Sequence, residues 1–314
     1  MSLINSPLLS FELEKDIRAG VAAHNEEQNI GQLLDVLTSI QLFRHITVVS
    51  SGSTDTTNAI VQERSRNDPR IKLIEETTRS GKSNAVNRLI RESPCDILVF
   101  MSGDTIPTKE SVDCLLKWFD DPNVGAVSAK PVPVNPKKGF GYVAHIMWSA
   151  HWNYMWNLTL SKKLVHVSGE MCAFSTQALS HIPHDIINED SYLAIASKTK
   201  GLKILIDPNA IVYMRAPTNI VELINQRRRV IAGHKQILKR TSHFPTVLVT
   251  SWWKNLPEFA RTAAAVFREF RLRLFLWGVV LLQSETVAFA LTVGHLGRTM
   301  RSPWEPLTST KRVS

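Results

Sequence analysis

The stretch ILVFMSGD at residues 97–104 is the part of the sequence that decides the fold. Five consecutive apolar residues, followed by a serine, a glycine and an aspartate, are typical of a buried parallel strand that ends in a loop. Amphipathic segments separate this run from similar β-branched runs at 17–23, 46–50, 71–75 and 124–128. The alternation predicts βαβ units that build a largely parallel sheet, and therefore an α/β fold. Prolines at 131, 133 and 136 predict the end of this pattern.

Polar residues follow three of these runs. They read HNEE at 24–27, SSGSTD at 50–55 and SGD at 102–104. In parallel sheets, ligands bind beyond the carboxyl ends of the strands, where loops and helix N-termini meet. Hydroxyl, amide and carboxyl groups at this edge suit ribose, phosphate or a metal ion, so the three loops are candidate site elements.

Two acidic motifs have both a catalytic and a structural interpretation. Asp104 is suited to Mg²⁺ or Mn²⁺, which bridge one or two carboxylates to phosphate oxygens, whereas the structural alternative is an aspartate that starts a turn before Pro107. Glu189 and Asp190 precede a predicted helix. An acidic pair at that position serves either in catalysis or in capping the helix.

Basic groups suited to phosphate occur in two places. Lys82 opens an amphipathic segment after Gly81 and offers its ammonium group to phosphate, with a solvated lysine as the alternative. Glu76 stands where a Walker motif has its first glycine, which argues against a kinase or an ATPase. Residues 226–229, QRRR, lie in a predicted helix, where three consecutive arginines spread over roughly 200° and cannot all face one site.

In this order and at these separations, the motifs resemble glycosyltransferase family 2, the inverting GT-A enzymes that include cellulose, chitin and hyaluronan synthases. The resemblance covers residues 17 to about 235. It implies a Rossmann-like, mostly parallel sheet, a nucleotide-sugar donor and a divalent cation, Mg²⁺ or Mn²⁺. It assigns donor binding to His24, Asn25, Glu26, Ser51, Lys82, Ser102, Gln226 and Arg229, metal binding to Asp104, acceptor contacts to Ser168, Gly169 and Glu170, and catalysis to Glu189 and Asp190.

The sequence departs from the family pattern at three points. Ser50 and Ser51 stand where the family has an aspartate that recognises the base, which leaves the nucleobase open. Ser102 replaces the first aspartate of the DxD metal motif, and Val230 replaces the tryptophan that closes QxxRW. These two replacements favour the transfer of a single sugar over processive polymer synthesis.

The net charge of +9 is concentrated in one region, because residues 226–314 hold fifteen Lys and Arg against four Glu. Four tryptophans and long apolar runs in this region favour membrane lipids over nucleic acid as its partner; they are Trp252, Trp253, Trp277 and Trp304. The three cysteines match no redox or zinc spacing, and the first residues lack a signal-peptide pattern. The sequence therefore predicts a protein at the cytoplasmic face of a membrane.

The C-terminal region contains two predicted helices. Residues 259–274 place apolar side chains on one face and arginines largely opposite, as in a membrane-surface helix or a helix packed on the catalytic domain. Residues 274–296 are long enough to cross a bilayer, but QSE at 283–285 lies at their centre. Arginines flank this segment on both sides, so spanning, re-entrant and interfacial arrangements all stay open.

The expected organisation is a GT-A domain over residues 1–235 and a membrane-associated region over 236–314. The donor half of the domain is expected at about 17–130 and the acceptor half at about 131–235. The expected activity moves a sugar from a nucleotide-diphosphate sugar to a lipid-linked or growing saccharide acceptor, with membrane proteins as further partners. The alternatives are an inactive scaffold subunit of a glycan-assembly complex and a nucleotidyltransferase. The acidic HNEE loop argues against the latter, which uses a glycine-rich, basic loop.

Overall fold

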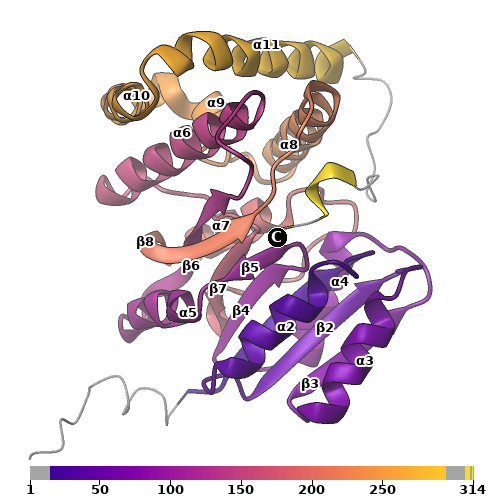
Figure 1. Ribbon diagram of the computed structural model, residues 1–314. Coiled ribbons are helices and arrows are strands. Elements are labelled where there is room, and N and C mark those ends of the chain that lie inside the picture. The colour runs from indigo at the N-terminus through magenta and orange to yellow at the C-terminus, as the bar shows by residue number, and fades with distance from the viewer. Residues whose placement is uncertain (1–14, 295–307, 312, 314) are drawn as a thin grey trace, which may run out of the picture.

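The computed structural model describes residues 15–294, 308–311 and 313 (Figure 1). One eight-stranded sheet runs through the molecule in the order β3-β2-β1-β4-β7-β6-β8-β5. The strands are β1 (Ile17–Ala23), β2 (His45–Ser51), β3 (Ile71–Glu76), β4 (Ile97–Ser102), β5 (Thr105–Pro107), β6 (Val124–Pro133), β7 (Met171–Ser175) and β8 (Lys203–Met214).

The first four strands are parallel, as the alternating pattern predicts. β1 pairs with both β2 and β4, and β2 pairs with β3. Beyond β4 the sheet is mixed, because β7 runs antiparallel to both β4 and β6. The carboxyl ends of β1, β2 and β4 therefore meet at one edge of the sheet.

Helices cover both faces of this sheet. One apolar core lies beneath α2 (Ile30–Ser39), α3 (Thr57–Asn67) and α5 (Lys109–Leu116). The other lies beneath α4 (Lys82–Glu92), α6 (Gly141–Leu160) and α7 (Glu189–Thr199). Short helical turns join these elements: η1 (Lys117–Asp120), η2 (Thr176–Ala178), α9 (Leu248–Ser251), η3 (Trp252–Lys254) and η4 (Thr308–Thr310).

Strand β6 differs from the sequence prediction. The prolines were expected to end the pattern, yet β6 continues through Pro131 and Pro133 and pairs with β8 as far as Met214. On its other side β6 pairs with β7 only from Ala126 to Ser128. Beyond Ser128 that side makes no ladder bond in the described structure, so the missing N–H groups of the prolines cost little.

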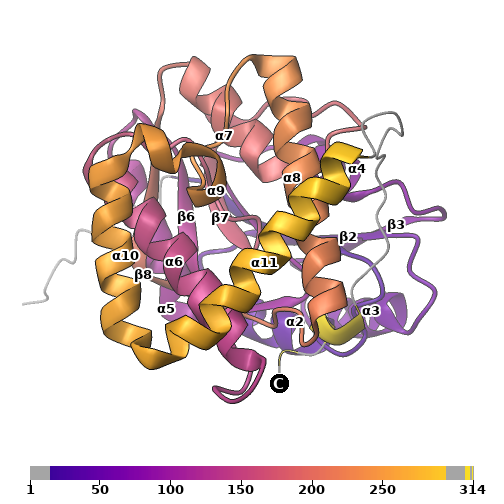
Figure 2. The same ribbon diagram turned by 90° about the horizontal axis from the view of Figure 1, so that it is seen from above.

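The C-terminal helices form a layer above α6. α8 (Ile220–Thr241) leads to α10 (Leu256–Phe270) and α11 (Leu272–Gly294). The boundary between residues 235 and 236, where the sequence predicts the C-terminal region to begin, lies inside α8. Figure 2 shows α11 lying flat across α6 and α8. The flanking residues Arg298, Arg301 and Trp304 and the end of the predicted 274–296 segment lie outside the described residues.

Contacts along its whole length hold α11 to this layer. The Arg273 guanidinium lies 4.9 Å from the ring centroid of Tyr142, and Glu285 forms an ion pair with Arg227 of α8. Lys235 Nζ lies 4.7 Å from the ring centroid of Phe289. α11 is also the helix in the described residues that is long and apolar enough to cross a membrane, with a mean hydropathy of 1.7 over Leu272–Val293.

Candidate functional site

One cavity of about 890 Å³ begins at the carboxyl ends of the parallel strands and continues beneath the C-terminal helices. It is lined by thirteen of the fourteen residues assigned from the sequence: His24, Glu26, Ser51, Lys82, Ser102, Asp104, Ser168, Gly169, Glu170, Glu189, Asp190, Gln226 and Arg229. The fold therefore brings together motifs that lie far apart along the chain.

Asn25 is the assigned residue that does not line this cavity. It adopts a left-handed backbone conformation with φ 54°. Its side-chain oxygen accepts a hydrogen bond of 2.8 Å from the backbone N–H of Thr54. Asn25 therefore ties the loop after β1 to the loop after β2, and this tie positions its neighbour His24, whose Nδ1 lies 2.8 Å from the Ser51 carbonyl oxygen.

Glu26 and Asp104 form an acidic pair at the ends of β1 and β4. Glu26 is almost fully buried, and burial together with the charge of Asp104 raises the pKa of Glu26 to about 8. Gly103 allows this approach, because a Cβ atom there would lie 3.0 Å from Glu26 Cγ. The described residues contain no ready-made cluster of three or more metal ligands. Asp104 nevertheless fits a cation that takes its other oxygen ligands from a diphosphate.

Lys82, Glu189 and Asp190 meet around Gly169. Lys82 Nζ lies 2.9 Å from Glu189 Oε1 and donates to the Gly169 carbonyl oxygen at 3.3 Å. A Cβ atom on Gly169 would lie 3.0 Å from Asp190 Oδ2 and 3.2 Å from Lys82 Nζ. Only glycine fits between these two charged groups without displacing them.

The charged side chains in this group change one another's pKa values. Burial alone would lower the pKa of Lys82, but the carboxylates of Glu189 and Asp190 raise it above its usual value. Burial raises the pKa of Asp190, while the Lys82 charge and hydrogen bonds from Ser191 and Gly169 oppose the rise. Lys82 therefore stays cationic, and Asp190 is a carboxylate with increased proton affinity. Glu189 is occupied by its ion pair with Lys82.

The floor of the cavity is the loop that leads into β7. The Ser168 hydroxyl donates to Glu170 Oε2, and its backbone N–H donates to the Ser128 hydroxyl at 2.8 Å. Burial raises the pKa of Glu170. The Ser102 hydroxyl, which stands where the family has an acidic residue, donates to the Gly169 carbonyl oxygen at 3.0 Å. This bond joins the end of β4 to the loop before β7.

α8 supplies the opposite wall. It packs closely on the start of α7, because a Cβ atom on Gly233 would lie 2.4 Å from Asn188 Cγ. The Asn188 amide donates to the Val230 carbonyl oxygen at 3.0 Å. Of the three consecutive arginines, Arg227 and Arg229 line the cavity. This division agrees with the prediction that they cannot all face one site.

Sequence reasoning missed a histidine cluster in the same wall. The rings of His151 and His166 lie 5.5 Å apart, and those of His166 and His234 lie 6.2 Å apart, each pair edge to face. Burial lowers the pKa of His166 to about 4, and burial together with neighbouring positive charge lowers the pKa of His151 to about 3. These imidazoles are therefore neutral at pH 7. Isolated histidines on helices and loops carry no motif that would have identified them.

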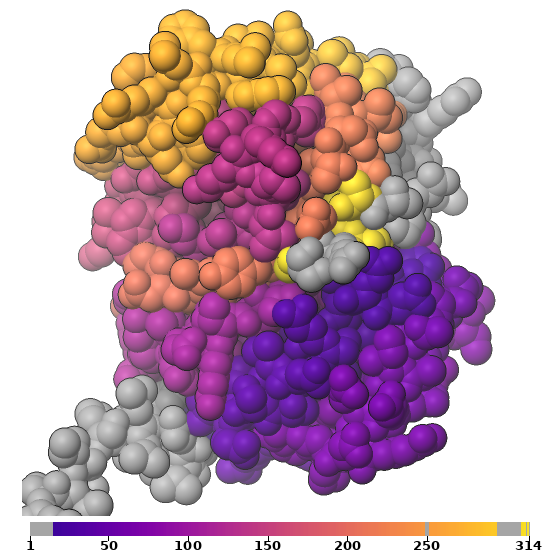
Figure 3. Space-filling view, viewed as in Figure 1, coloured from indigo at the N-terminus to yellow at the C-terminus, as the bar shows by residue number. Residues whose placement is uncertain are grey.

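Sequence reasoning also missed the return of residues 308–311 to the site. Lys311 forms an ion pair with Glu26 and donates to the His24 carbonyl oxygen at 2.9 Å. The Ser309 hydroxyl donates to Glu222 at the start of α8. Figure 3 shows this segment in yellow between the indigo half of the molecule and α8. It bridges the two sides of the cavity.

Comparison with known proteins gives a family match and two groups of relatives. Residues 19–182 match the family model described as Glycosyl transferase family 2. A poly-beta-1,6-N-acetyl-D-glucosamine synthase from Staphylococcus aureus (strain COL) is 24% identical over 261 residues, which are 79% of this chain and 63% of that protein. The synthase of the same name from Staphylococcus epidermidis is 24% identical over 233 residues, 72% of this chain and 56% of that protein. This chain thus spans less than two thirds of these curated relatives.

Solved structures resemble the whole arrangement. A mannosyltransferase from Pyrobaculum calidifontis, in complex with GDP-Man and Mn²⁺, has a TM-score of 0.59 at 21% identity, over 93% of this chain and 87% of that chain. Glucosyl-3-phosphoglycerate synthase from Mycobacterium tuberculosis, with Mn²⁺, UDP and glucosyl-3-phosphoglycerate, has a TM-score of 0.53 at 19% identity, over 78% of this chain and 88% of that chain. These likenesses confirm the predicted GT-A fold.

Proposed function

The chain belongs to glycosyl transferase family 2, and from this premise we propose that it transfers a sugar, with inversion, from a nucleotide-diphosphate sugar to an acceptor hydroxyl. The observation that carries the proposal is the group of Lys82, Glu189 and Asp190 around Gly169. It places a carboxylate of increased proton affinity beside a permanent cation, in a cavity large enough for a donor and an acceptor.

The proposed reaction is an in-line displacement at the anomeric carbon. Asp190 removes the proton of the acceptor hydroxyl while that oxygen forms a bond to the anomeric carbon. The bond between this carbon and the diphosphate oxygen breaks, and the nucleoside diphosphate leaves with the electron pair. Lys82 and Arg229, which both line the cavity, stabilise the charge that develops on the leaving group.

A divalent cation fits the donor side of this site. Asp104 would hold Mg²⁺ or Mn²⁺ against the two phosphates, and the cation would neutralise the leaving diphosphate when bound. Mn²⁺ is present in the mannosyltransferase complex and in the glucosyl-3-phosphoglycerate synthase complex described above. Glu26, whose pKa of about 8 leaves it mostly protonated at pH 7 and whose carboxyl group contacts Lys311, is a second acidic side chain at the same place.

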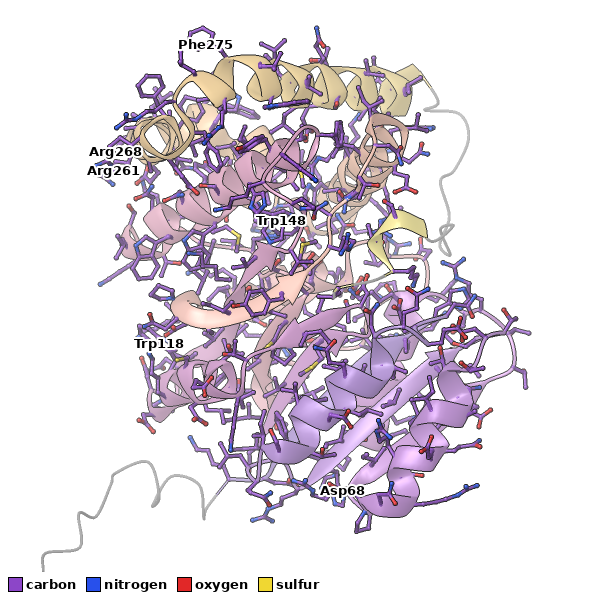
Figure 4. All side chains as sticks on the ribbon, in the orientation of Figure 1. Asp68, Trp118, Trp148, Arg261, Arg268 and Phe275 are labelled. Carbon is purple, nitrogen blue, oxygen red and sulfur yellow. The ribbon has the colours of Figure 1, made fainter. Side chains whose placement is uncertain are left out.

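The C-terminal helices support attachment to a membrane surface. The outward face of α11 is apolar, with Leu272 84% exposed and Phe275 73% exposed. Figure 4 shows Phe275 pointing away from the domain and Arg261 and Arg268 projecting from α10 beside it. Apolar side chains flanked by arginines suit the interface of an anionic bilayer.

The same geometry favours α11 lying in the plane of the membrane over α11 crossing it. α11 packs along α8, which carries Arg227, Lys235 and Lys239. If α11 crossed the bilayer, these cations would enter the hydrocarbon with it, at roughly 2.5 to 3.5 kcal/mol each on insertion scales. An in-plane helix keeps them and Glu285 in the protein and gives only its outer face to lipid. We therefore place the catalytic cavity at the cytoplasmic surface of the membrane in this proposal.

The test is nucleoside diphosphate release by the detergent-purified protein with Mn²⁺ or Mg²⁺, a panel of nucleotide sugars and a membrane lipid extract. Release from one donor is expected, and Asp190→Asn should reduce it by at least about a hundredfold, as expected for loss of a general base. Asp185→Asn is the matched control, because Asp185 lies just before α7 and pairs with Arg240 outside the cavity. Near-full release by Asp190→Asn would refute the assignment of the base. No release of nucleoside diphosphate from any donor in the panel would favour the alternative of an inactive scaffold subunit.

A further inference from the structure

The cavity does not end at the polar residues of the transfer site. Beneath the C-terminal helices its wall is formed by apolar residues of α6, α10 and α11, here called the annex: Ile146, Phe259, Ala263, Val266, Leu274 and Gly278. None of them carries a charge or a side-chain hydrogen-bonding group. A sugar nucleotide has no long apolar group to bury against an apolar wall. The annex therefore suits a different, apolar part of a ligand.

Besides Arg227 Nε, which lies against Glu285 in their ion pair, three buried polar atoms of the described cavity lining have no hydrogen-bond partner. Trp148 Nε1, Gln226 Oε1 and Glu285 Oε2 are buried and make no hydrogen bond within the described part of the chain, and all three residues line the cavity. Figure 4 shows Trp148 in the middle of the molecule, between α6 and the sheet. Buried polar atoms in native proteins nearly always have partners, so a donor and two acceptors left open in a cavity wall mark a place for ligand hydroxyls.

The charges nearby favour an uncharged head group at this place. The Arg227 guanidinium is already paired with Glu285, so it offers no spare charge to a phosphate. The adjoining wall consists of the His151, His166 and His234 rings, packed edge to face. A sugar, which both donates and accepts hydrogen bonds, suits this lining better than an anion.

The annex also reaches the lipid-facing surface. Leu282 lines the cavity and is 68% exposed, on the same apolar face of α11 as Phe275. Ala263, on the neighbouring face of α10, lines the cavity and is also exposed. An apolar chain anchored in a membrane can therefore enter the annex from the side without crossing water.

We propose that the acceptor is a glycolipid-like amphiphile, with its sugar head at Trp148, Gln226 and Glu285 and its apolar chain in the annex. This inference rests on the proposed function, because it names the class of acceptor used at the same site. It decides between the lipid-linked and the purely saccharide acceptors in favour of the former.

The test measures binding alone and needs no donor. Glucose and its octyl, decyl and dodecyl β-glucosides, each below its micelle concentration, are titrated calorimetrically into the purified protein. The dissociation constant should fall about three- to fourfold for each methylene that enters the annex. Ala263→Trp fills the annex and should abolish the dependence on chain length. Ala264→Trp, the matched control one residue away, is exposed outside the cavity lining and should retain it.

A second variant tests the head group independently. Trp148→Phe removes the open N–H and keeps the ring, so it should weaken binding by about five- to tenfold at every chain length without changing the slope. The inference is overturned if binding does not depend on chain length. It is also overturned if Ala263→Trp and Ala264→Trp lose the dependence on chain length equally. If chain-dependent binding is found but no donor releases nucleotide, the annex stands and the proposed function fails. If the protein transfers sugar to a soluble saccharide and glucoside binding does not depend on chain length, the proposed function stands and the inference about the annex fails.

Discussion

The ion pair between Arg227 and Glu285 is a partly buried charged contact that joins α11 to α8. Each of the two side chains is only 16% exposed. Removing one partner of a buried pair leaves the other charge uncompensated, at about 3 to 5 kcal/mol. Because both residues line a cavity that water can enter, we expect an effect below that range, about 2 kcal/mol, for Arg227→Met or Glu285→Gln.

The pair has a matched control on the surface. Lys203 and Asp121 lie 2.5 Å apart, but their side chains are 55% and 37% exposed. A solvent-exposed pair of this kind contributes about 0.2 to 1 kcal/mol. Both pairs join a basic side chain to a carboxylate at short distance and differ most in burial, so comparing them measures mainly the effect of burial.

A double-mutant cycle measures each pair through urea unfolding in mild detergent, followed by tryptophan fluorescence. The buried pair should show a coupling energy of at least about 1 kcal/mol, and the double variant should be more stable than the sum of the two single effects predicts. A coupling below about 0.5 kcal/mol, or one no larger than that of Lys203–Asp121, would show that Glu285 does not anchor α11. The in-plane arrangement would then lose its main support.

Two further predictions concern pH and the membrane. His166 has a pKa of about 4 in the folded protein, below its usual value, so the folded state binds fewer protons and stability is lost as pH falls from about 6.5 toward 4. The effect should reach about 2 to 3 kcal/mol, and an unfolding series in which His166→Gln shows the same pH slope as the parent would disprove it. Phe275→Ser should reduce flotation with anionic vesicles several-fold, whereas Leu160→Ser, at another exposed apolar site on α6, should leave it unchanged. Equal losses would show that the outer face of α11 is not the membrane-binding surface.

The sequence predicted the parallel half of the sheet well, because it depends on local patterns. β1 matches its predicted limits, since Ile17–Ala23 is apolar except for Arg18 and is bounded by charged and polar residues. β6 runs further than predicted, because a proline disrupts a strand only where the ladder needs the N–H group that proline lacks. Whether it is needed depends on which strands pair with β6 on its two sides, and that is set by the whole sheet. Local sequence cannot report which neighbours a strand will have.

The candidate site was predicted where residues follow strands and was missed where they come from distant segments. His24 and Asp104 stand at strand ends, which any parallel sheet brings to one edge. The sequence could not show that the side chain of Asn25 turns toward the neighbouring loop, because periodicity gives no side-chain direction in a left-handed residue. Lys311 was missed because nothing near it in the sequence indicates a partner in the first strand loop.

The bridge formed by Lys311 has a consequence for the order in which the protein folds. Its partner Glu26 is 285 residues earlier in the chain, so the contact closes a loop that spans most of the protein. Closing such a loop has a large entropic cost and cannot precede synthesis of the last elements. The parallel strands can therefore assemble on the ribosome long before the donor side of the cavity receives its final lysine. A nascent chain would carry a formed sheet and an unfinished cavity, so the sugar-nucleotide binding that we propose would begin only after the C-terminal layer has folded.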